Sequence, residues 1–306
     1  MTDSSHDHTH AHDLGFAHDL PRMLGRRRLL TLMGGLGLGA ASGLPAAALE
    51  ACGTALPWET AGPYPADGSN TKDGQTVNAL KQEGILRTDI TSSFGDYEGS
   101  VEGVPLELEL VLMNSDGCTP LEGYAIYIWH CDGGGKYSLY DYTDANWLRG
   151  LGVADAEGKV RFTTIVPGCY DGRWPHIHFE VFESATAAVS GEASLLTAQI
   201  AIPEDHASEV YAQDQAEYPN STTNLGHITI PTDNVFGDNT EEEIAQQTLA
   251  MAGDPETGFA GTVTIPVDFN ADRTLNMPEP PAGGMGGMGQ PPEGGNGNMP
   301  PPPSNN

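Results

Sequence analysis

Residues 104–113 read Val-Pro-Leu-Glu-Leu-Glu-Leu-Val-Leu-Met, and this stretch decides the fold class. From Leu106 to Leu112 every second residue is leucine, and Glu107 and Glu109 lie between them. Side chains two apart on a β-strand point to the same face, so the leucines form an apolar face and the glutamates a polar one. The stretch therefore predicts a half-buried strand.

Further stretches on both sides have β-branched, aromatic or alternating apolar residues and end at turn-forming residues. They are residues 124–130, 159–166, 176–182, 195–202, 227–230 and 261–267. One helix is expected from the capping box at Thr240–Glu243 through Ala252. Short strands separated by frequent turns favour an all-β chain, an antiparallel β-sandwich with immunoglobulin-like or transthyretin-like layering, long loops and few short helices.

The two ends of the 306-residue chain differ in composition from its middle. Residues 1–48 have the features of a cleaved export leader, because Arg26–Arg28 precede an uncharged run rich in Leu and Gly and Ala46–Ala48 offer small residues for cleavage. Paired arginines favour the twin-arginine route over a plain secretory signal. Residues 276–306, rich in Pro, Gly, Met and Asn, predict a disordered tail. One β-sandwich domain is expected between them, at residues 49–275.

The formal net charge is −29, which disfavours nucleic acid and anionic membrane surfaces as partners. We expect an exported protein, periplasmic or extracellular, without a membrane span, because the apolar run of the leader is short. The oligomeric state is left open. In an oxidising compartment two disulfides can form, in three connectivities that the sequence does not distinguish. They would join the four cysteines Cys52, Cys118, Cys131 and Cys169.

Chemically active side chains concentrate in residues 167–178, Pro-Gly-Cys-Tyr-Asp-Gly-Arg-Trp-Pro-His-Ile-His. His176 and His178 would face the same side of a strand and could meet one metal ion, although an ordinary strand with two hydrogen-bonded histidines is the simpler alternative. Tyr170, and Tyr137 after a glycine run, add phenol oxygens unless they are ordinary core or rim aromatics. Phenolate is a hard anionic donor, so two phenolates with two imidazoles favour ferric iron over zinc.

Three segments in this order, residues 129–138, 162–170 and 173–179, resemble the intradiol ring-cleavage dioxygenases, the family of protocatechuate 3,4-dioxygenase and catechol 1,2-dioxygenase. Thr60–Tyr64 is similar to the segment that lines the substrate pocket of protocatechuate 3,4-dioxygenase. The resemblance runs from about Pro57 to Pro203 in the same motif order.

The resemblance implies a β-sandwich that holds one non-haem Fe(III) per chain. It implies the metal ligands Tyr137, Tyr170, His176 and His178. The reaction it implies is cleavage of a catechol-type aromatic by O2 to a cis,cis-muconate-type product, with the catechol and O2 as the small-molecule partners.

The resemblance also implies roles outside the ligand set. Gly62, Pro63 and Tyr64 would contact the substrate. Arg173 would contact the substrate and stabilise negative charge on its ring, although an ion pair at a sheet edge is the simpler interpretation of this residue. Tyr170 would leave the metal and accept a substrate proton. Gln199 would orient the reaction intermediate, unless it is an ordinary polar residue of an edge strand.

Cys131, after His130, and Cys169, next to Tyr170, lie within the motif segments and suggest an exported branch of the family in which disulfides brace the site. A carboxylated catechol is disfavoured because few cations are near the motifs, Lys136 and Arg149 being the candidates beside Arg173. Which catechol is the substrate is left open. Two alternatives also stay open: a non-catalytic exported β-sandwich that binds carbohydrate or metal, and an enzyme that uses zinc or copper.

Overall fold

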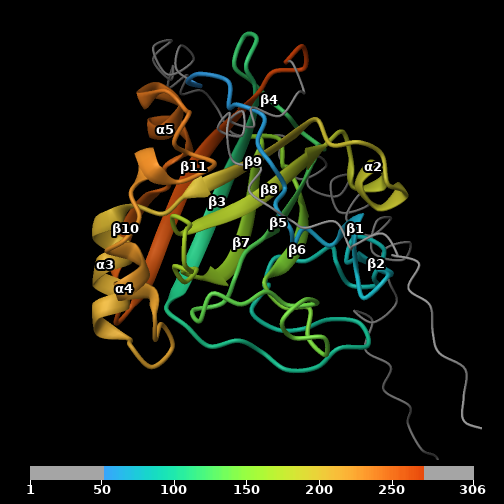
Figure 1. The fold of residues 1–306 in the computed structure, drawn as a ribbon. Coiled ribbons are helices and arrows are strands. Elements are labelled where there is room, and N and C mark those ends of the chain that lie inside the picture. The colour runs from blue at the N-terminus through green and yellow to red at the C-terminus, as the bar shows by residue number, and fades with distance from the viewer. Residues whose placement is uncertain (1–51, 272–306) are drawn as a thin grey trace, which may run out of the picture. The chain divides into compact units, whose positions relative to one another are not determined.

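The computed structural model describes residues 52–271, which form two main β-sheets and a short hairpin (Figure 1). The expected leader, residues 1–48, and the expected tail, residues 276–306, lie outside the described residues. No helix within residues 52–271 is long and apolar enough to cross a membrane.

The first sheet contains the strand that decides the fold class. Its strands are β3 (Pro105–Asn114), β4 (Thr119–Pro120), β7 (Lys159–Ile165), β10 (Ala250–Asp254) and β11 (Gly258–Val267). β10 pairs with β11 and β11 with β3, while β4 and β7 both pair with β3. The leucines of β3 are all buried, which confirms the predicted alternation. The β3–β11 pair runs parallel, and the other pairs of this sheet are antiparallel.

The second sheet is antiparallel throughout and has the order β6–β5–β8–β9. Its strands are β5 (Ala125–Trp129), β6 (Arg149–Val153), β8 (His176–Phe182) and β9 (Leu196–Ala201). Ile177, Phe179 and Val181 of β8 join the leucines of β3 in the main hydrophobic core. The alternate residues of β8 face the other way, yet they are buried too, because long loops cover the outer face. The all-β sandwich is therefore confirmed.

The remaining elements are short and lie around the sheets (Figure 1). They are β1 (Asp67–Lys72), β2 (Gln75–Asn78), α2 (Ala185–Ser190), α3 (Glu204–Gln213), α4 (Ser221–Leu225), the 3-10 helix η3 (Ile230–Thr232) and α5 (Glu241–Gln247). α5 contacts both β9 and β11, so it links the two sheets at one edge.

Two expectations for the C-terminal part are wrong. Residues 227–230 form no strand, because Pro231 lacks a backbone N–H and η3 begins at Ile230. The helix from the capping box at Thr240 ends at Gln247 and does not continue to Ala252. The chain becomes extended there because it pairs with strands instead: the Leu249 N–H donates to Ala201 O at 3.0 Å, and β10 forms a hairpin with β11.

The expected disulfide bracing of the site is also wrong. Cys52 is bonded to Cys118, which joins the start of the described chain to the turn between β3 and β4. Cys131 and Cys169 are buried free thiols. Each donates to a carbonyl oxygen at 3.4 Å, Cys131 to Gly168 and Cys169 to Arg173, so the loops are held by hydrogen bonds and not by a second disulfide.

Candidate metal centre

Four side chains converge on the outer face of the second sheet. The Nε2 atoms of His176 and His178 are 3.0 Å apart. The Tyr137 hydroxyl lies 3.4 Å from His178 Nε2, and the Tyr170 hydroxyl lies 3.3 Å from His176 Nε2. The structure thus brings all four predicted ligands together. Such spacings are those of donors that share one ion at bond lengths of about 2 Å.

Two loops bring the tyrosines to the histidine pair. Tyr137 lies between β5 and β6, and Tyr170 lies between β7 and β8. The loops approach closely at Gly135, which has φ +79° and where an added Cβ would lie 2.8 Å from the Cβ of Tyr170. At Gly168 an added Cβ would lie 2.3 Å from Gly133 O. The glycine run is therefore needed for the approach of the two tyrosines.

Hydrogen bonding and stacking orient the two imidazoles. His176 Nδ1 contacts Trp174 O, and a carbonyl only accepts, so Nδ1 carries the proton and Nε2 of the neutral ring presents its lone pair to the centre. The His178 ring stacks on Trp129 with centroids 4.9 Å apart and planes at 3°. Its Nδ1 has no hydrogen-bond partner among residues 52–271.

Burial sets the protonation of the four side chains in the metal-free chain. It raises the pKa of Tyr137 well above the usual value and that of Tyr170 to about 12, although the charge of Arg173 partly opposes the latter shift. Burial also lowers the pKa of both His176 and His178. The phenols are therefore protonated and the imidazoles neutral at pH 7. A cation bound among them would favour the phenolate forms.

The donor set fits a metal only if the phenols take part. Within residues 52–271 no group of three or more His, Cys, Asp and Glu side chains is arranged to hold a metal ion. Two neutral imidazoles and two phenols supply nitrogen and hard oxygen donors, and the lone pair of His176 already points inward. This chemistry fits ferric iron.

A row of side chains crosses all four strands of the sheet at His178. Register places Arg149 of β6 beside Trp129 of β5, Trp129 beside His178 of β8, and His178 beside Gln199 of β9. Cross-strand neighbours share one face, so the row puts Gln199 on the face that carries the histidines.

Arg173 reaches this face through two strong hydrogen bonds. Its Nε donates to Asp233 Oδ2 at 2.9 Å, and one terminal nitrogen donates to Gln199 Oε1 at 2.6 Å. Gln199 Nε2 in turn donates to Thr60 O at 3.0 Å. Arg173 only donates and Thr60 O only accepts, so the orientation of the Gln199 amide is fixed by its partners. Arg173 is both a member of a buried ion pair and a neighbour of the tyrosines.

Asp233 is a site residue that the sequence did not reveal. Its side chain is fully buried, and besides Arg173 it accepts hydrogen bonds from the N–H groups of Trp174, Val235 and Phe236. Burial tends to raise its pKa, but Arg173 and these donors outweigh that effect, so its pKa is lowered. Asp233 is 60 residues from Arg173 and lies in no recognised motif, so no sequence signal pointed to it.

The predicted substrate segment lies against the same centre. Gly62 has φ +71°, and an added Cβ would lie 3.3 Å from His178 Cε1. The ring of Tyr64 packs against Tyr137 with centroids 4.9 Å apart. Pro63, between them, accepts a hydrogen bond from Asn70 Nδ2 through its carbonyl oxygen. The structure therefore places Gly62 and Tyr64 at the centre, with Pro63 held on the adjoining loop.

The two other candidate cations, Arg149 and Lys136, are paired with groups outside the centre. Arg149 is fully buried and donates to Ser138 Oγ, Ser138 O and Pro65 O at 2.9–3.1 Å and to Tyr127 Oη at 3.2 Å. It thus links Ser138, the residue after Tyr137, to Pro65, the residue after the predicted substrate segment. Lys136 is largely exposed and lies 3.8 Å from Asp141.

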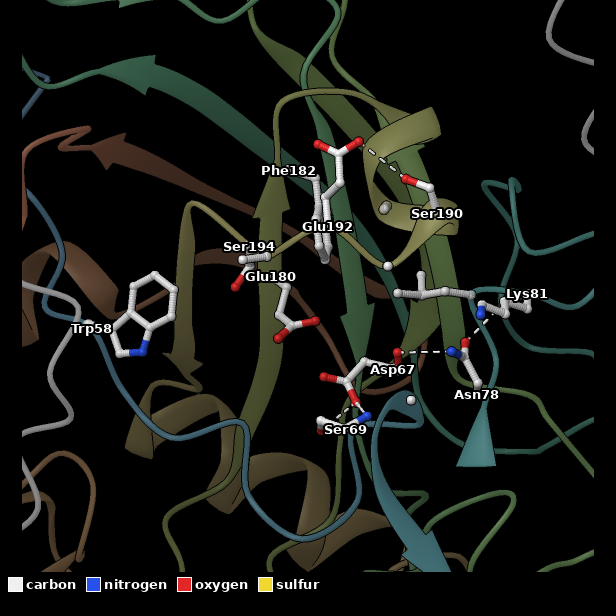
Figure 2. A pocket seen from close by; sticks show the side chains of 15 residues that line it. Trp58, Asp67, Ser69, Asn78, Lys81, Glu180, Phe182, Ser190, Glu192 and Ser194 are labelled. Carbon is white, nitrogen blue, oxygen red and sulfur yellow. Dashed lines mark hydrogen bonds between the residues drawn. The ribbon is translucent and has the colours of Figure 1, made fainter. Parts of the chain in front are cut away.

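A cavity of about 550 Å³ opens farther along the same strand face (Figure 2). Its wall includes Glu180 and Phe182, which follow the histidines at alternate positions of β8, together with Trp58 and Asp67. None of the predicted site residues lines it. Figure 2 shows the Glu180 carboxyl beside Asp67, and burial, reinforced by the charge of Asp67, raises the pKa of Glu180 to about 8.

Comparison with known proteins identifies a family model and proteins to which this chain is similar. Residues 87–217 match the family model described as Dioxygenase, a range that contains all four candidate ligands, Arg173 and Gln199. The chain is 30% identical over 105 residues to the chlorocatechol 1,2-dioxygenase of Pseudomonas sp. (strain P51), an alignment that covers 28% of this chain and 41% of that protein. The chain thus spans less than half the length of this curated relative.

A solved structure extends the likeness to the fold. The intradiol ring-cleavage dioxygenase from Tetranychus urticae superimposes with a TM-score of 0.53 at 21% identity, covering 72% of this chain and 98% of that one. At this identity the likeness concerns the fold, which is that of an intradiol ring-cleavage dioxygenase.

Proposed function

We propose that this chain, whose residues 87–217 match the Dioxygenase family and whose fold is that of the intradiol ring-cleavage dioxygenases, cleaves a catechol-type aromatic with O2 between the two hydroxyl-bearing carbons. The product would be a cis,cis-muconate-type diacid. The activity would depend on one non-haem Fe(III), held by Tyr137, Tyr170, His176 and His178.

One observation carries the proposal: contacts of 3.0–3.4 Å link two phenols and two imidazoles beside a guanidinium that is only 12% exposed. A non-catalytic binding module has no use for this combination. Zinc or copper would not require two phenol donors, whereas a hard ferric ion favours them.

The side chains of the chain supply binding, orientation and proton transfer. A bound ferric ion would act as a Lewis acid toward the two catechol oxygens. Tyr170, in the phenolate form that a bound cation would favour, would be the acceptor for a proton from a catechol hydroxyl. Arg173, whose charge already opposes part of the rise in the pKa of Tyr170, would stabilise negative charge on the ring. Gln199 would orient the reacting group through its fixed amide, and Gly62 and Tyr64 would form the wall against which the ring packs.

The substrate would be a catechol without a carboxylate. The charge of Arg173 is balanced by Asp233, and Arg149 is fully occupied by uncharged acceptors. An anionic ring substituent would therefore meet no unpaired cation among these residues, and the net charge of −29 disfavours its approach.

We also infer that the protein is exported by the twin-arginine route and acts in the periplasm or outside the cell. Arg26–Arg28, the apolar run and Ala46–Ala48 support this, and so does the Cys52–Cys118 disulfide, because such bonds persist in oxidising compartments. The N-terminal sequence of protein recovered from the periplasm or medium tests it: an intact N-terminus on cytoplasmic protein would contradict export.

The enzyme is tested with the full chain loaded with Fe(III) and, as a matched control, with Zn(II). We expect a red charge-transfer band only with iron, and O2 uptake with muconate formation when catechol is added. Tyr170→Phe should shift or bleach the band, while Tyr142→Phe, at an exposed tyrosine outside the site, should not. Iron-loaded protein that turns over no catechol would refute the enzyme, and an unchanged band in Tyr170→Phe would remove that ligand.

A further inference from the structure

On the outer edge of β9 the backbone carbonyl of every second residue accepts a hydrogen bond from outside the sheet. The Glu59 N–H donates to Thr197 O at 2.8 Å, and the Leu249 N–H donates to Ala201 O at 3.0 Å. The carbonyl between them, that of Gln199, is satisfied by a side chain: Gln247 Nε2 donates to it at 3.2 Å. Gln199, whose side-chain amide accepts the hydrogen bond from Arg173, is thus the residue of this edge whose backbone carbonyl is bonded by a side chain, that of Gln247.

Gln247 belongs to a closed cluster with Glu59 and Asn239. Gln247 Nε2 donates to Glu59 Oε1 at 2.7 Å, and Asn239 Nδ2 donates both to Glu59 Oε1 and to Gln247 Oε1 at 2.8 Å. Glu59 and Gln247 are buried. Every amide hydrogen of Gln247 and Asn239 therefore has an acceptor, and the cluster admits one arrangement of its side chains.

The main chain beside Glu59 closes the connection to the site. Thr60 O accepts the hydrogen bond from Gln199 Nε2, and the neighbouring Glu59 N–H bonds Thr197 O, two residues earlier on the same strand. Gln199 Oε1 accepts from Arg173 at 2.6 Å. Hydrogen bonds thus lead from Glu59 and Gln247 through Gln199 to the guanidinium that faces the tyrosines.

We propose that Glu59, Gln247 and Asn239 are positioning residues that hold the Gln199 amide, and through it the Arg173 guanidinium, in the orientation the site requires. Glu59 Oε2 is buried without a hydrogen-bond partner among the described residues, so a carboxyl at this position is costly to bury and is not explained by packing alone. The catalytic part of this proposal rests on the proposed function, whereas the positioning itself does not.

Gln247→Ala tests the positioning, with Gln246→Ala as its matched control. Both glutamines lie at the end of α5 and each donates to a strand carbonyl, but Gln246 donates to Thr264 of β11. In NMR spectra of the metal-free full chain we expect Gln247→Ala to shift the Gln199 side-chain amide signals. We also expect it to speed exchange of the hydrogens on the terminal Arg173 nitrogen that donates to Gln199 Oε1 about tenfold, because this acceptor is loosened. Gln246→Ala should leave both unchanged.

Kinetics of the iron-loaded protein supply the second arm. Gln247→Ala should lower kcat for catechol about tenfold with a smaller change in KM, since misplaced charge weakens transition-state stabilisation more than binding. In a Gln199→Ala background the same substitution should change kcat by less than about twofold, because its effect passes through Gln199. Glu59→Gln keeps an amide oxygen as the acceptor and should retain the wild-type NMR signals, whereas Glu59→Ala should reproduce Gln247→Ala.

The two arms fail separately. Unchanged Gln199 and Arg173 signals in a folded Gln247→Ala protein would overturn the positioning, and so would a full kinetic effect that persists in the Gln199→Ala background. Absence of turnover by the wild-type protein would overturn the proposed function while the NMR comparison still decides the positioning.

Discussion

Replacing Asp233 with alanine should destabilise the protein strongly, although the residue lies far in sequence from every motif. Its carboxylate accepts four hydrogen bonds, from Arg173 Nε and from the N–H groups of Trp174, Val235 and Phe236. The Arg173 side chain is only 12% exposed and that of Asp233 is 0% exposed. Removal of one partner leaves a buried charge and three backbone donors without an acceptor.

The expected cost follows from burial. Breaking a buried ion pair by removing one partner costs about 3–5 kcal/mol of unfolding free energy. Asp233→Asn keeps one oxygen acceptor but turns an NH2 group toward donors, so we expect about 1.5–3 kcal/mol. Because the pKa of Asp233 is lowered in the folded protein, its stabilisation is present above the unfolded pKa and is lost as the pH falls below it.

Urea unfolding at pH 7 measures these costs, with Glu109→Ala as the control. Glu109 lies 2.6 Å from an Arg161 nitrogen, closer than Asp233 is to Arg173, but the Arg161 side chain is 60% exposed. Exposed pairs contribute about 0–1 kcal/mol. If Asp233→Ala costs no more than Glu109→Ala, the inference that burial makes the Asp233 pair essential is refuted.

Three further predictions concern the buried carboxyl of Glu59, the glycine run before Tyr137 and the two free thiols. Burial raises the pKa of Glu59 to about 7, so the contribution of Glu59 to stability is complete below its unfolded pKa and is lost as the pH rises through 7. Glu59→Gln should therefore reduce the fall in unfolding free energy between the unfolded pKa and pH 7 by up to about 3 kcal/mol. An unaltered dependence of the unfolding free energy on pH in this variant would contradict the prediction. Gly135→Ala should destabilise by about 1–3 kcal/mol more than Gly117→Ala in urea melts, because both glycines have φ +79° but only an added Cβ at Gly135 would meet the side chain of Tyr170, at 2.8 Å. Alkylation of the unfolded, unreduced protein followed by mass mapping should label Cys131 and Cys169 only; a bond between these two would contradict the structure.

The histidine pair and the first strand could be predicted because their signals are local. Period-two spacing determines that His176 and His178 share a face whatever the rest of the chain does, and the same rule buries the leucines of β3. The motif resemblance added Tyr137 and Tyr170, which come from separate loops that no periodicity connects. Their convergence depends on the close approach at Gly135, which the sequence displays only as a glycine run.

The hydrogen-bonded residues that hold Arg173 and Gln199 could not be predicted, because each of their contacts joins distant parts of the chain. Asp233 is 60 residues from Arg173, Asn239 is 180 residues from Glu59, and Gln247 is 188 residues from Glu59. The end of the capping-box helix was predicted at Ala252 instead of Gln247 for the same reason. The chain leaves α5 at Gln247 because the next residues bond the edge of β9, and an edge that accepts them is a property of the folded sheet.

The position of the centre explains why the C-terminal segment is needed at all. The candidate ligands lie on the outer face of a sheet, which would be open to water if only β5, β6, β8 and β9 were present. Loops cover that face, and Asp233 on the segment before α5 supplies the carboxylate that allows a guanidinium to remain beside two phenols. The pKa of Tyr170 is raised by burial, and the charge of Arg173 opposes part of this rise, so removing the Asp233 support would change the pKa of Tyr170 as well as the stability. The fold beyond the motifs thus sets the electrostatics of the residues within them.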